Sequence, residues 1–119
     1  MEDSLKNKLA ESGIDVDNAM ERFMDNDALF IKFLVKFPDD PNMASLRQGL
    51  DERDIDMAFR AAHTLKGVCG NLSLAALAKP VSESTEFLRA GDIDSAVAKM
   101  PEIEKDYAKA VDVIKSCIQ

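Results

Sequence analysis

The spacing of the apolar residues constrains this chain more than any other feature. Along almost the whole sequence, apolar residues recur every three or four positions, which places them on one face of a helix. No segment alternates apolar and polar residues as a half-buried strand does. The chain is therefore expected to fold as an all-α protein.

Two short helices are expected at the N-terminal end. The first carries Leu5 and Leu9 and ends at Gly13, because glycine commonly follows the last turn of a helix. Ile14 and Val16 lead into the second helix. The apolar face of this second helix is expected to consist of Met20, Phe23 and Met24.

A third helix is expected to begin at Asp27, whose side chain can cap its first turn. Pro38 and Pro41 then interrupt the pattern, because proline has no backbone N–H to donate. With Asp40 as a cap and Pro41 in the first turn, a new helix can start. The apolar residues of the third helix are Leu29, Phe30, Phe33, Leu34 and Phe37, and those of the new one are Met43, Leu46 and Leu50.

Three longer helices complete the expected set. One runs over about 54–71 and another over about 74–88, and Ala90-Gly91-Asp92 then indicates a helix end, a turn and a new cap. The last covers about 93–114, with a kink expected at Pro101. Because short connections join long amphipathic helices, the expected fold is an antiparallel up-down four-helix bundle with additional short N-terminal helices.

The length of 119 residues suits a single domain, expected over 1–119 with its bundle core at about 27–118. The formal charge is −7 with no cluster of Lys and Arg, so nucleic acid is not an expected partner. No apolar run approaches membrane-spanning length and no helix has a basic polar face, so a membrane is not expected either. A cytoplasmic monomer is the expectation.

Cysteine and histidine usage argues against a metal site. Cys69 and Cys117 lack CxxC spacing, and a single histidine cannot complete a usual zinc set. Cys69 lies on an apolar stripe and is expected to be a buried free thiol. No metal and no cofactor are therefore expected in this chain.

The most informative helix is the one expected over 54–71. On a helical wheel its core stripe consists of Ile55, Ala58, Phe59, Ala62, Leu65, Cys69 and Leu72. His63 lies at the solvent edge of this stripe. The neighbours of His63 within two turns, which together with it we call the histidine strip, are Phe59, Arg60, Lys66, Gly67 and Gly70.

The histidine strip combines features that suit the uptake of an anion. A glycine inside a helix destabilises the helix by about 1 kcal/mol relative to alanine. The presence of Gly67 and Gly70 therefore needs an explanation. One explanation is that the missing side chains let the backbone of a partner approach His63. Lys66 supplies a cation, and an exposed imidazole is largely neutral and nucleophilic near neutral pH. The alternative is a solvated surface histidine, with Gly70 as part of a helix end. The coincidence on one strip favours the functional interpretation.

The stretch Ala62-His63-Thr64-Leu65-Lys66-Gly67, followed by Asn71-Leu72, resembles the signature of histidine-containing phosphotransfer (HPt) domains. The resemblance covers most of the chain. Residues 14–37 are similar to the opening helices of the family, 46–54 to its approach to the histidine helix, and 89–92 to its turn before the last helix.

This resemblance implies a phosphoryl carrier of two-component phosphorelays. His63 would be the phosphoacceptor, Lys66 the residue near the phosphoryl group and Gly67 the clearance position, with Gly70, Phe59 and Arg60 at the docking edge. The implied partners are response-regulator receiver domains, which contribute the Mg²⁺, and also a hybrid histidine kinase. The chain shows no Walker-type phosphate loop and no kinase nucleotide signature, so no ATP-dependent enzyme activity of its own is expected.

Four positions depart from the family pattern. Ser73 stands where glycine is usual, and Pro80, Ser84 and Thr85 stand where the family tends to have Leu, Leu and Glu. Pro80 is expected to kink its helix or to end a first segment.

Two other functions remain open. The chain could be a non-catalytic helical adaptor in which His63 is incidental, or the phosphoacceptor fragment of a larger histidine kinase. The initial Met1 and the closing residues 117–119 favour a complete short chain over a fragment.

Overall fold

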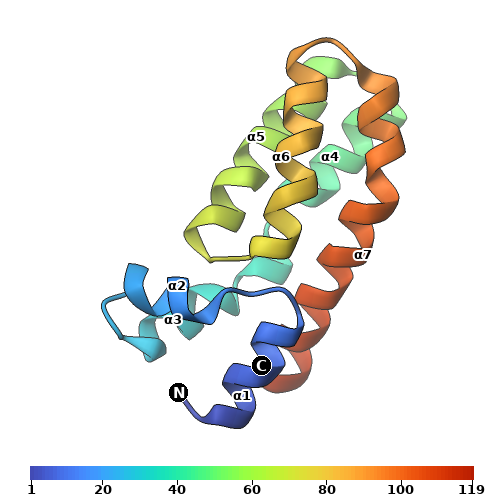
Figure 1. The fold of residues 1–119 in the computed structure, drawn as a ribbon. Coiled ribbons are helices and arrows are strands. Elements are labelled where there is room, and N and C mark those ends of the chain that lie inside the picture. Colours follow the sequence, from blue (N-terminus) through green and yellow to red (C-terminus); the bar gives the residue numbers. More distant parts are fainter.

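Figure 1 shows a computed structural model of the protein, which describes all 119 residues and contains helices but no strand. The molecule is elongated, with extents of 43 × 24 × 20 Å. None of its helices combines the length and the apolar character needed to span a membrane. The elements are α1 (Asp3–Glu11), α2 (Val16–Arg22), α3 (Asp27–Leu34), the 3₁₀-helix η1 (Phe37–Asp39), α4 (Asn42–Asp51), α5 (Ile55–Asn71), α6 (Ala75–Arg89) and α7 (Ile93–Cys117).

The four longest helices pack in chain order. Helix α4 contacts α5, α5 contacts α6, and α6 contacts α7, while α4 also touches α7. Helices α1, α2 and α3 gather at the end of the molecule where α5 finishes, and both chain termini lie at that end (Figure 1). Helix α1 and the 3₁₀-helix η1 both contact α7.

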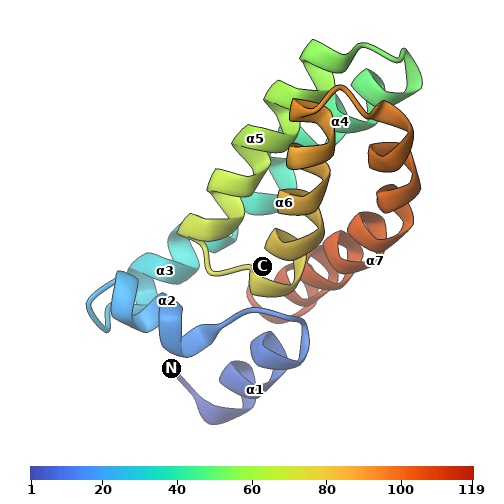
Figure 2. The same ribbon diagram turned by 45° about the horizontal axis from the view of Figure 1, so that its top comes forward.

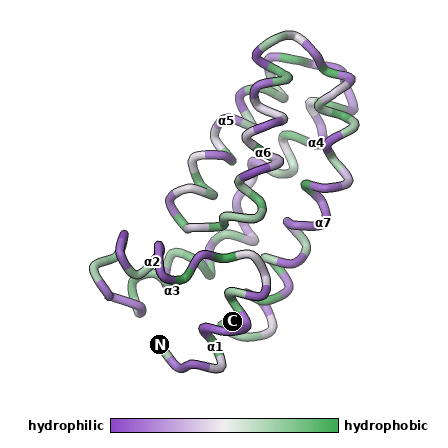
Figure 3. Tube along the Cα trace, viewed as in Figure 1, coloured by the Kyte–Doolittle hydropathy of each residue, from purple (hydrophilic) through white to green (hydrophobic).

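One apolar core of 25 buried residues runs through the molecule. Hydrophobic and hydrophilic residues alternate along the helices, as Figure 3 shows, because each helix turns one face inward. The core includes Leu9, Ile14, Val16 and Ala19, so the N-terminal helices share it with α4 to α7. Phe30 and Phe37 are its largest fully buried side chains.

Side chains cap the helices where the sequence indicates, with one correction. Asp54 and Asp92 each accept a hydrogen bond from the backbone N–H three residues later. For α3, Asn26 is the cap, since its side chain accepts from the N–H of Leu29 at 3.0 Å. The expectation that Asp27 caps α3 is wrong, because its carboxylate pairs with the N-terminal ammonium of Met1 at 2.6 Å.

The entry to α4 follows the expected pattern only in part. Asp40 accepts a hydrogen bond from the N–H of Asn42 at 2.9 Å, and Pro41 already has helical backbone angles, with φ −80° and ψ −9°. Helix α4 itself begins at Asn42, so Pro41 is its cap residue and the start lies one residue later than expected, while the Asp40 side chain still accepts from the first N–H of the helix.

Two short helices end earlier than expected. Helix α2 stops at Arg22, and Met24 lies in the turn beyond it with a left-handed φ of 51° and 89% of its surface exposed. The expectation that Met24 shares an apolar face with Met20 and Phe23 is therefore wrong, because the chain leaves the helix before Met24. Helix α3 stops at Leu34. Phe37, expected on this helix, belongs instead to η1, where its side chain is buried.

The two interior prolines do not end their helices. Helix α6 runs continuously through Pro80, so of the two expected outcomes, a kink or the end of a first segment, the second is wrong; α7 likewise runs through Pro101. Each proline removes a single backbone hydrogen bond, while burial of residues before and after Pro80 holds α6 together. Figure 2 shows α7 bending along its length, which fits a proline in its interior.

Ser73 anchors the end of α5 to the N-terminal helices. Its φ is +57°, a left-handed conformation that glycine adopts at lower cost, and the next N–H, of Leu74, donates to Cys69 O at 2.9 Å. The serine hydroxyl donates to Asn18 Oδ1 at 2.7 Å, and the N–H of Asp15 donates to Ser73 O at 2.8 Å. The hydroxyl bond to Asn18 is what the serine adds here, because the backbone carbonyl that accepts from Asp15 would be present in glycine as well.

A bidentate ion pair links α4 to α7. The Nε and Nη2 atoms of Arg47 donate to the two carboxylate oxygens of Glu104 at 2.8 and 2.6 Å. The guanidinium carbon also lies 5.3 Å from the centre of the Tyr107 ring. The hydrogen bonds from Arg47 lower the pKa of Glu104, although partial burial opposes them.

Candidate functional site

The histidine strip lies on the outer face of α5. The opposite face is buried through Ala58, Ala61, Ala62, Leu65 and Cys69, and their spacing determines which residues point outward. The helix also starts where the sequence indicates, because Asp54 accepts from the N–H of Met57 at 3.1 Å. The strip is therefore presented by a helix that is capped at its start and anchored at its end.

His63 is exposed, and no hydrogen bond or ion pair within the chain holds its imidazole. Its contact is with Phe59, one turn earlier, whose ring centre lies 5.8 Å from the imidazole centre with the planes tilted by 31°. Both ring nitrogens therefore remain available for chemistry. The structure places His63 on the solvent-exposed side of α5, next to the buried face, as the helical wheel indicates.

The two cations of the strip differ in how they are held. Lys66 is exposed and makes no ion pair, and its position three residues after His63 puts it on the same face of α5. Arg60 is also exposed, but its Nε donates to the backbone oxygen of Asp56 at 3.3 Å. Lys66 is thus free to pair with a negative group at His63, whereas Arg60 is turned back toward the preceding turn of the helix.

Gly67 and Gly70 face open space. A Cβ on either of them would meet no atom of the protein within 4 Å. Gly49 of α4 differs, because a Cβ there would lie 2.7 Å from the backbone nitrogen of Ala58. Gly49 lets α4 and α5 pack closely, whereas each glycine of the strip costs about 1 kcal/mol relative to alanine. Nothing in the packing of this chain requires Gly67 or Gly70.

Cys69 lies behind the strip and takes no part in it. It is fully buried, and burial raises the pKa of its thiol to about 12, with a smaller contribution in the same direction from Asp40. The thiol is therefore held protonated and unreactive. No group of three or more His, Cys, Asp and Glu side chains is arranged to hold a metal ion.

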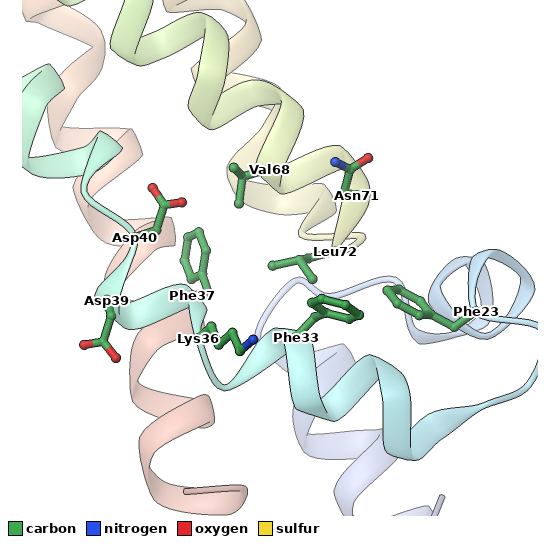
Figure 4. Close-up of a pocket in the computed structure, with 9 residues that line it drawn as sticks. All are labelled: Phe23, Phe33, Lys36, Phe37, Asp39, Asp40, Val68, Asn71 and Leu72. Carbon is green, nitrogen blue, oxygen red and sulfur yellow. The ribbon is translucent and has the colours of Figure 1, made fainter.

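An apolar groove, which the sequence analysis missed, adjoins the C-terminal half of α5 (Figure 4). Phe33 is 43% exposed and packs against Phe23, with ring centres 6.0 Å apart. Leu29 and Phe33 belong to the apolar residues expected on α3, but both are exposed, whereas Phe30 and Leu34 of the same helix are buried. The residues lining the groove are Phe23, Phe33, Lys36, Phe37, Asp39, Asp40, Val68, Asn71 and Leu72.

Arg89 on α6 is a second residue whose place the sequence did not indicate. Its guanidinium carbon lies 5.0 Å from the centre of the Phe59 ring, although the two residues are 30 positions apart. The sequence marked Arg89 only as part of the turn before the last helix. Its proximity to the strip depends on how α6 packs against α5.

Comparison with known proteins gives one result. The family model described as Hpt domain matches residues 29–113, a range that contains the whole histidine strip. No curated protein and no solved structure matches the chain.

Proposed function

The chain belongs to the Hpt domain family, and from this premise we propose that His63 is its phosphoacceptor. The family transfers phosphoryl groups on a histidine in two-component signalling, and this chain has only one histidine. That histidine is exposed on α5 and has no internal partner. The presence of a single, accessible imidazole in a chain of this family is the observation that carries the proposal.

The proposed step is an in-line transfer from a receiver domain. The neutral Nε2 of His63 attacks the phosphorus of the receiver's aspartyl phosphate, the N–P bond forms, and the bond from phosphorus to the aspartate oxygen breaks. The electron pair of that bond leaves with the aspartate carboxylate, and the imidazole keeps its Nδ1 proton until water takes it. Catalysis in such a transfer consists of positioning and charge stabilisation. Reversal of the step on a second receiver completes the relay.

Lys66 is proposed to stabilise the transferred group. Its ammonium is unpaired, and it shares the face of α5 that carries His63, so it can approach the negative oxygens of the phosphoryl group. Arg60 is assigned a lesser part in orienting the product, because its Nε already donates to the backbone. The Mg²⁺ is proposed to be supplied by the receiver.

Docking is proposed to use the bare backbone at Gly67 and Gly70 together with the apolar edge at Phe59. The open space around both glycines lets a partner's backbone come close to the imidazole. The apolar groove begins at Val68 and Asn71, directly beside the glycines, and so extends the same surface. A modest interface of this kind suits a transient carrier that must release each receiver.

The helices α4 to α7 are proposed to form the antiparallel up-down four-helix bundle, with α1 to α3 as accessory helices. The short connections between them and the contact of α4 with α7 support this arrangement. We propose that the protein acts as a cytoplasmic monomer that carries phosphoryl groups and has no ATP chemistry of its own.

Replacement of His63 by glutamine tests the assignment. A panel of receiver domains is phosphorylated with radiolabelled acetyl phosphate and mixed with each protein, and label on this chain is followed. The wild type is expected to acquire acid-labile, base-stable label, and His63→Gln is expected to acquire none while melting at the wild-type temperature. Label surviving on the variant would remove His63 from its role.

The same experiment separates the carrier from an adaptor. The apolar groove would serve a purely binding protein equally well. An adaptor would bind receivers with or without the imidazole and would take up no label in either form. Absence of label on the wild type with every receiver of the panel, despite binding, would favour the adaptor.

A further inference from the structure

The imidazole of His63 is held by an aromatic contact alone. No hydrogen bond or ion pair orients it, and its ring centre lies 5.8 Å from that of Phe59. Aromatic pairs stabilise each other at separations of about 4.5–7 Å, so this contact is within range. An exposed histidine without such a contact would exchange among its staggered rotamers.

Phe59 is itself fixed from the side of α6. It is half-buried in a depression between α5 and α6, where it lies with Ile55, Leu88 and Arg89. The guanidinium carbon of Arg89 lies 5.0 Å from the centre of the Phe59 ring, and a cation within about 6 Å of an aromatic face is attracted to it. Arg89 therefore contacts Phe59, and Phe59 contacts His63; we call this series of two contacts the stack.

No side chain of α6 forms a hydrogen bond or an ion pair with the imidazole of His63. Thr85, one turn before Arg89, is fully buried and donates its hydroxyl to the backbone oxygen of Val81 at 2.8 Å. The carboxylate of Glu86 accepts from Nε of Arg89 at 3.3 Å. Among the hydrogen bonds, ion pairs and ring contacts of the structure, the stack is thus the only connection between the imidazole and α6.

We infer that Phe59 and Arg89 are positioning residues for the phosphoacceptor: Phe59 limits the rotation of the imidazole, and Arg89 acts through Phe59. This inference rests on the proposed function of His63. In-line attack requires Nε2 to point at phosphorus, and a poorly oriented nucleophile lowers the rate of the chemical step. Loss of the stack should therefore slow transfer at saturating receiver, where weaker docking no longer limits the rate.

The test uses paired substitutions. Phe59→Leu keeps an apolar side chain but removes the aromatic face, and Phe59→Tyr restores that face. Arg89→Gln keeps the stem but removes the charge, and Arg89→Lys restores the charge. Arg53→Gln is the matched control, because Arg53 is an exposed arginine paired with Asp94, away from the histidine strip.

Nuclear magnetic resonance reports directly on the surroundings of the imidazole. Its histidine signals would not change if Phe59 and Arg89 served only the stability of the fold. The chain has a single histidine, so the signals of its two ring C–H groups are identified without ambiguity. In the wild type these signals are expected to be shifted by the ring current of Phe59. Phe59→Leu should move them toward the positions of a free histidine, and Phe59→Tyr should leave them in place.

The kinetic readout is single-turnover transfer from a saturating phosphorylated receiver. Phe59→Leu is expected to slow transfer about 10-fold, while Phe59→Tyr and Arg53→Gln stay near the wild-type rate. Arg89→Gln is expected to slow it about 2- to 5-fold, with Arg89→Lys restoring it. Thermal unfolding of each variant checks that α5 and α6 remain folded.

Three outcomes would overturn the inference. Unchanged histidine signals in Phe59→Leu would show that no stack exists in solution. Shifted signals with an unchanged rate at saturation would show that the ring needs no positioning. If the wild type takes up no phosphoryl group, the proposed function fails and the positioning role with it, while the histidine signals still report whether the stack is present.

Discussion

Gly67→Ala tests most directly why a glycine lies inside the histidine helix. The backbone of Gly67 is not left-handed, and a Cβ there would meet nothing within 4 Å, so alanine fits without strain. Alanine is favoured over glycine in a helix interior by about 1 kcal/mol. We therefore expect the free energy of unfolding to rise by about 1 kcal/mol and the melting temperature by about 3 to 5 °C.

Gly49→Ala is the matched control, because it makes the same chemical change in the neighbouring helix. The new Cβ would lie 2.7 Å from the backbone nitrogen of Ala58, so α4 and α5 would have to move apart. Forced overpacking of this kind costs about 1–3 kcal/mol. The two substitutions should therefore change stability in opposite directions, as measured by urea denaturation followed by circular dichroism.

The functional half of the experiment uses a larger side chain. Gly67→Leu should fold, because its side chain points into open space, but it should block close approach of a receiver and slow phosphoryl transfer at least about 10-fold. If Gly67→Ala does not raise the stability, the glycine is needed for the fold itself. Access for a partner would then no longer be required to explain it. Transfer at the wild-type rate by Gly67→Leu would refute it outright.

Further predictions concern charge, burial and pH. Lys66→Ala should leave thermal unfolding unchanged but slow transfer about 10-fold, equivalent to roughly 1.4 kcal/mol of lost charge stabilisation, while Lys105→Ala, which removes an exposed lysine of α7, should do neither. Ser84→Ala should raise the free energy of unfolding by about 1 kcal/mol, because the fully buried hydroxyl has no hydrogen-bond partner; a lower stability in urea would show that it has one. Hydrogen bonds from Arg47 lower the pKa of Glu104 in the folded state, so the unfolded chain binds that proton more readily as the pH falls. The pair's contribution is therefore present above about pH 4.3 and is lost as the pH falls through the folded pKa. Because both side chains are partly exposed, this contribution should be at most about 1 kcal/mol, and Glu104→Gln should flatten the decline in melting temperature over that range. An identical decline in the variant would contradict this.

The histidine strip was predictable because it is a local feature. All its residues lie on α5, and the helical period alone places His63, Lys66, Gly67 and Gly70 on one face. The limits of that helix were also predictable, since the Asp54 cap acts within the first turn. The glycine turn at Gly91, with its φ of +81°, and the Asp92 cap followed for the same reason.

The N-terminal region was less predictable, because competing local signals lie close together there. Asn26 and Asp27 are both able to cap α3; the helix begins at Asp27 with Asn26 as its cap, and the Asp27 carboxylate pairs with the ammonium group of Met1. Met24 has an apolar side chain at a position that continues the pattern of Phe23, yet the backbone turns before it can be buried. In both cases the exact residue at which a helix begins or ends decides the outcome, and periodicity does not fix that residue.

Sequence alone was enough for the order of the helices, the exposure of the single histidine and the family resemblance, since each depends on residues within a few turns of one another. Packing decided the rest: the approach of Arg89 to Phe59, the pairing of Arg47 with Glu104, and the groove between α3 and α5. These features join residues from different helices, and their distances depend on how helices cross and how far they extend. Periodicity tells which side of a helix is buried, but it does not tell what lies against that side or what remains uncovered.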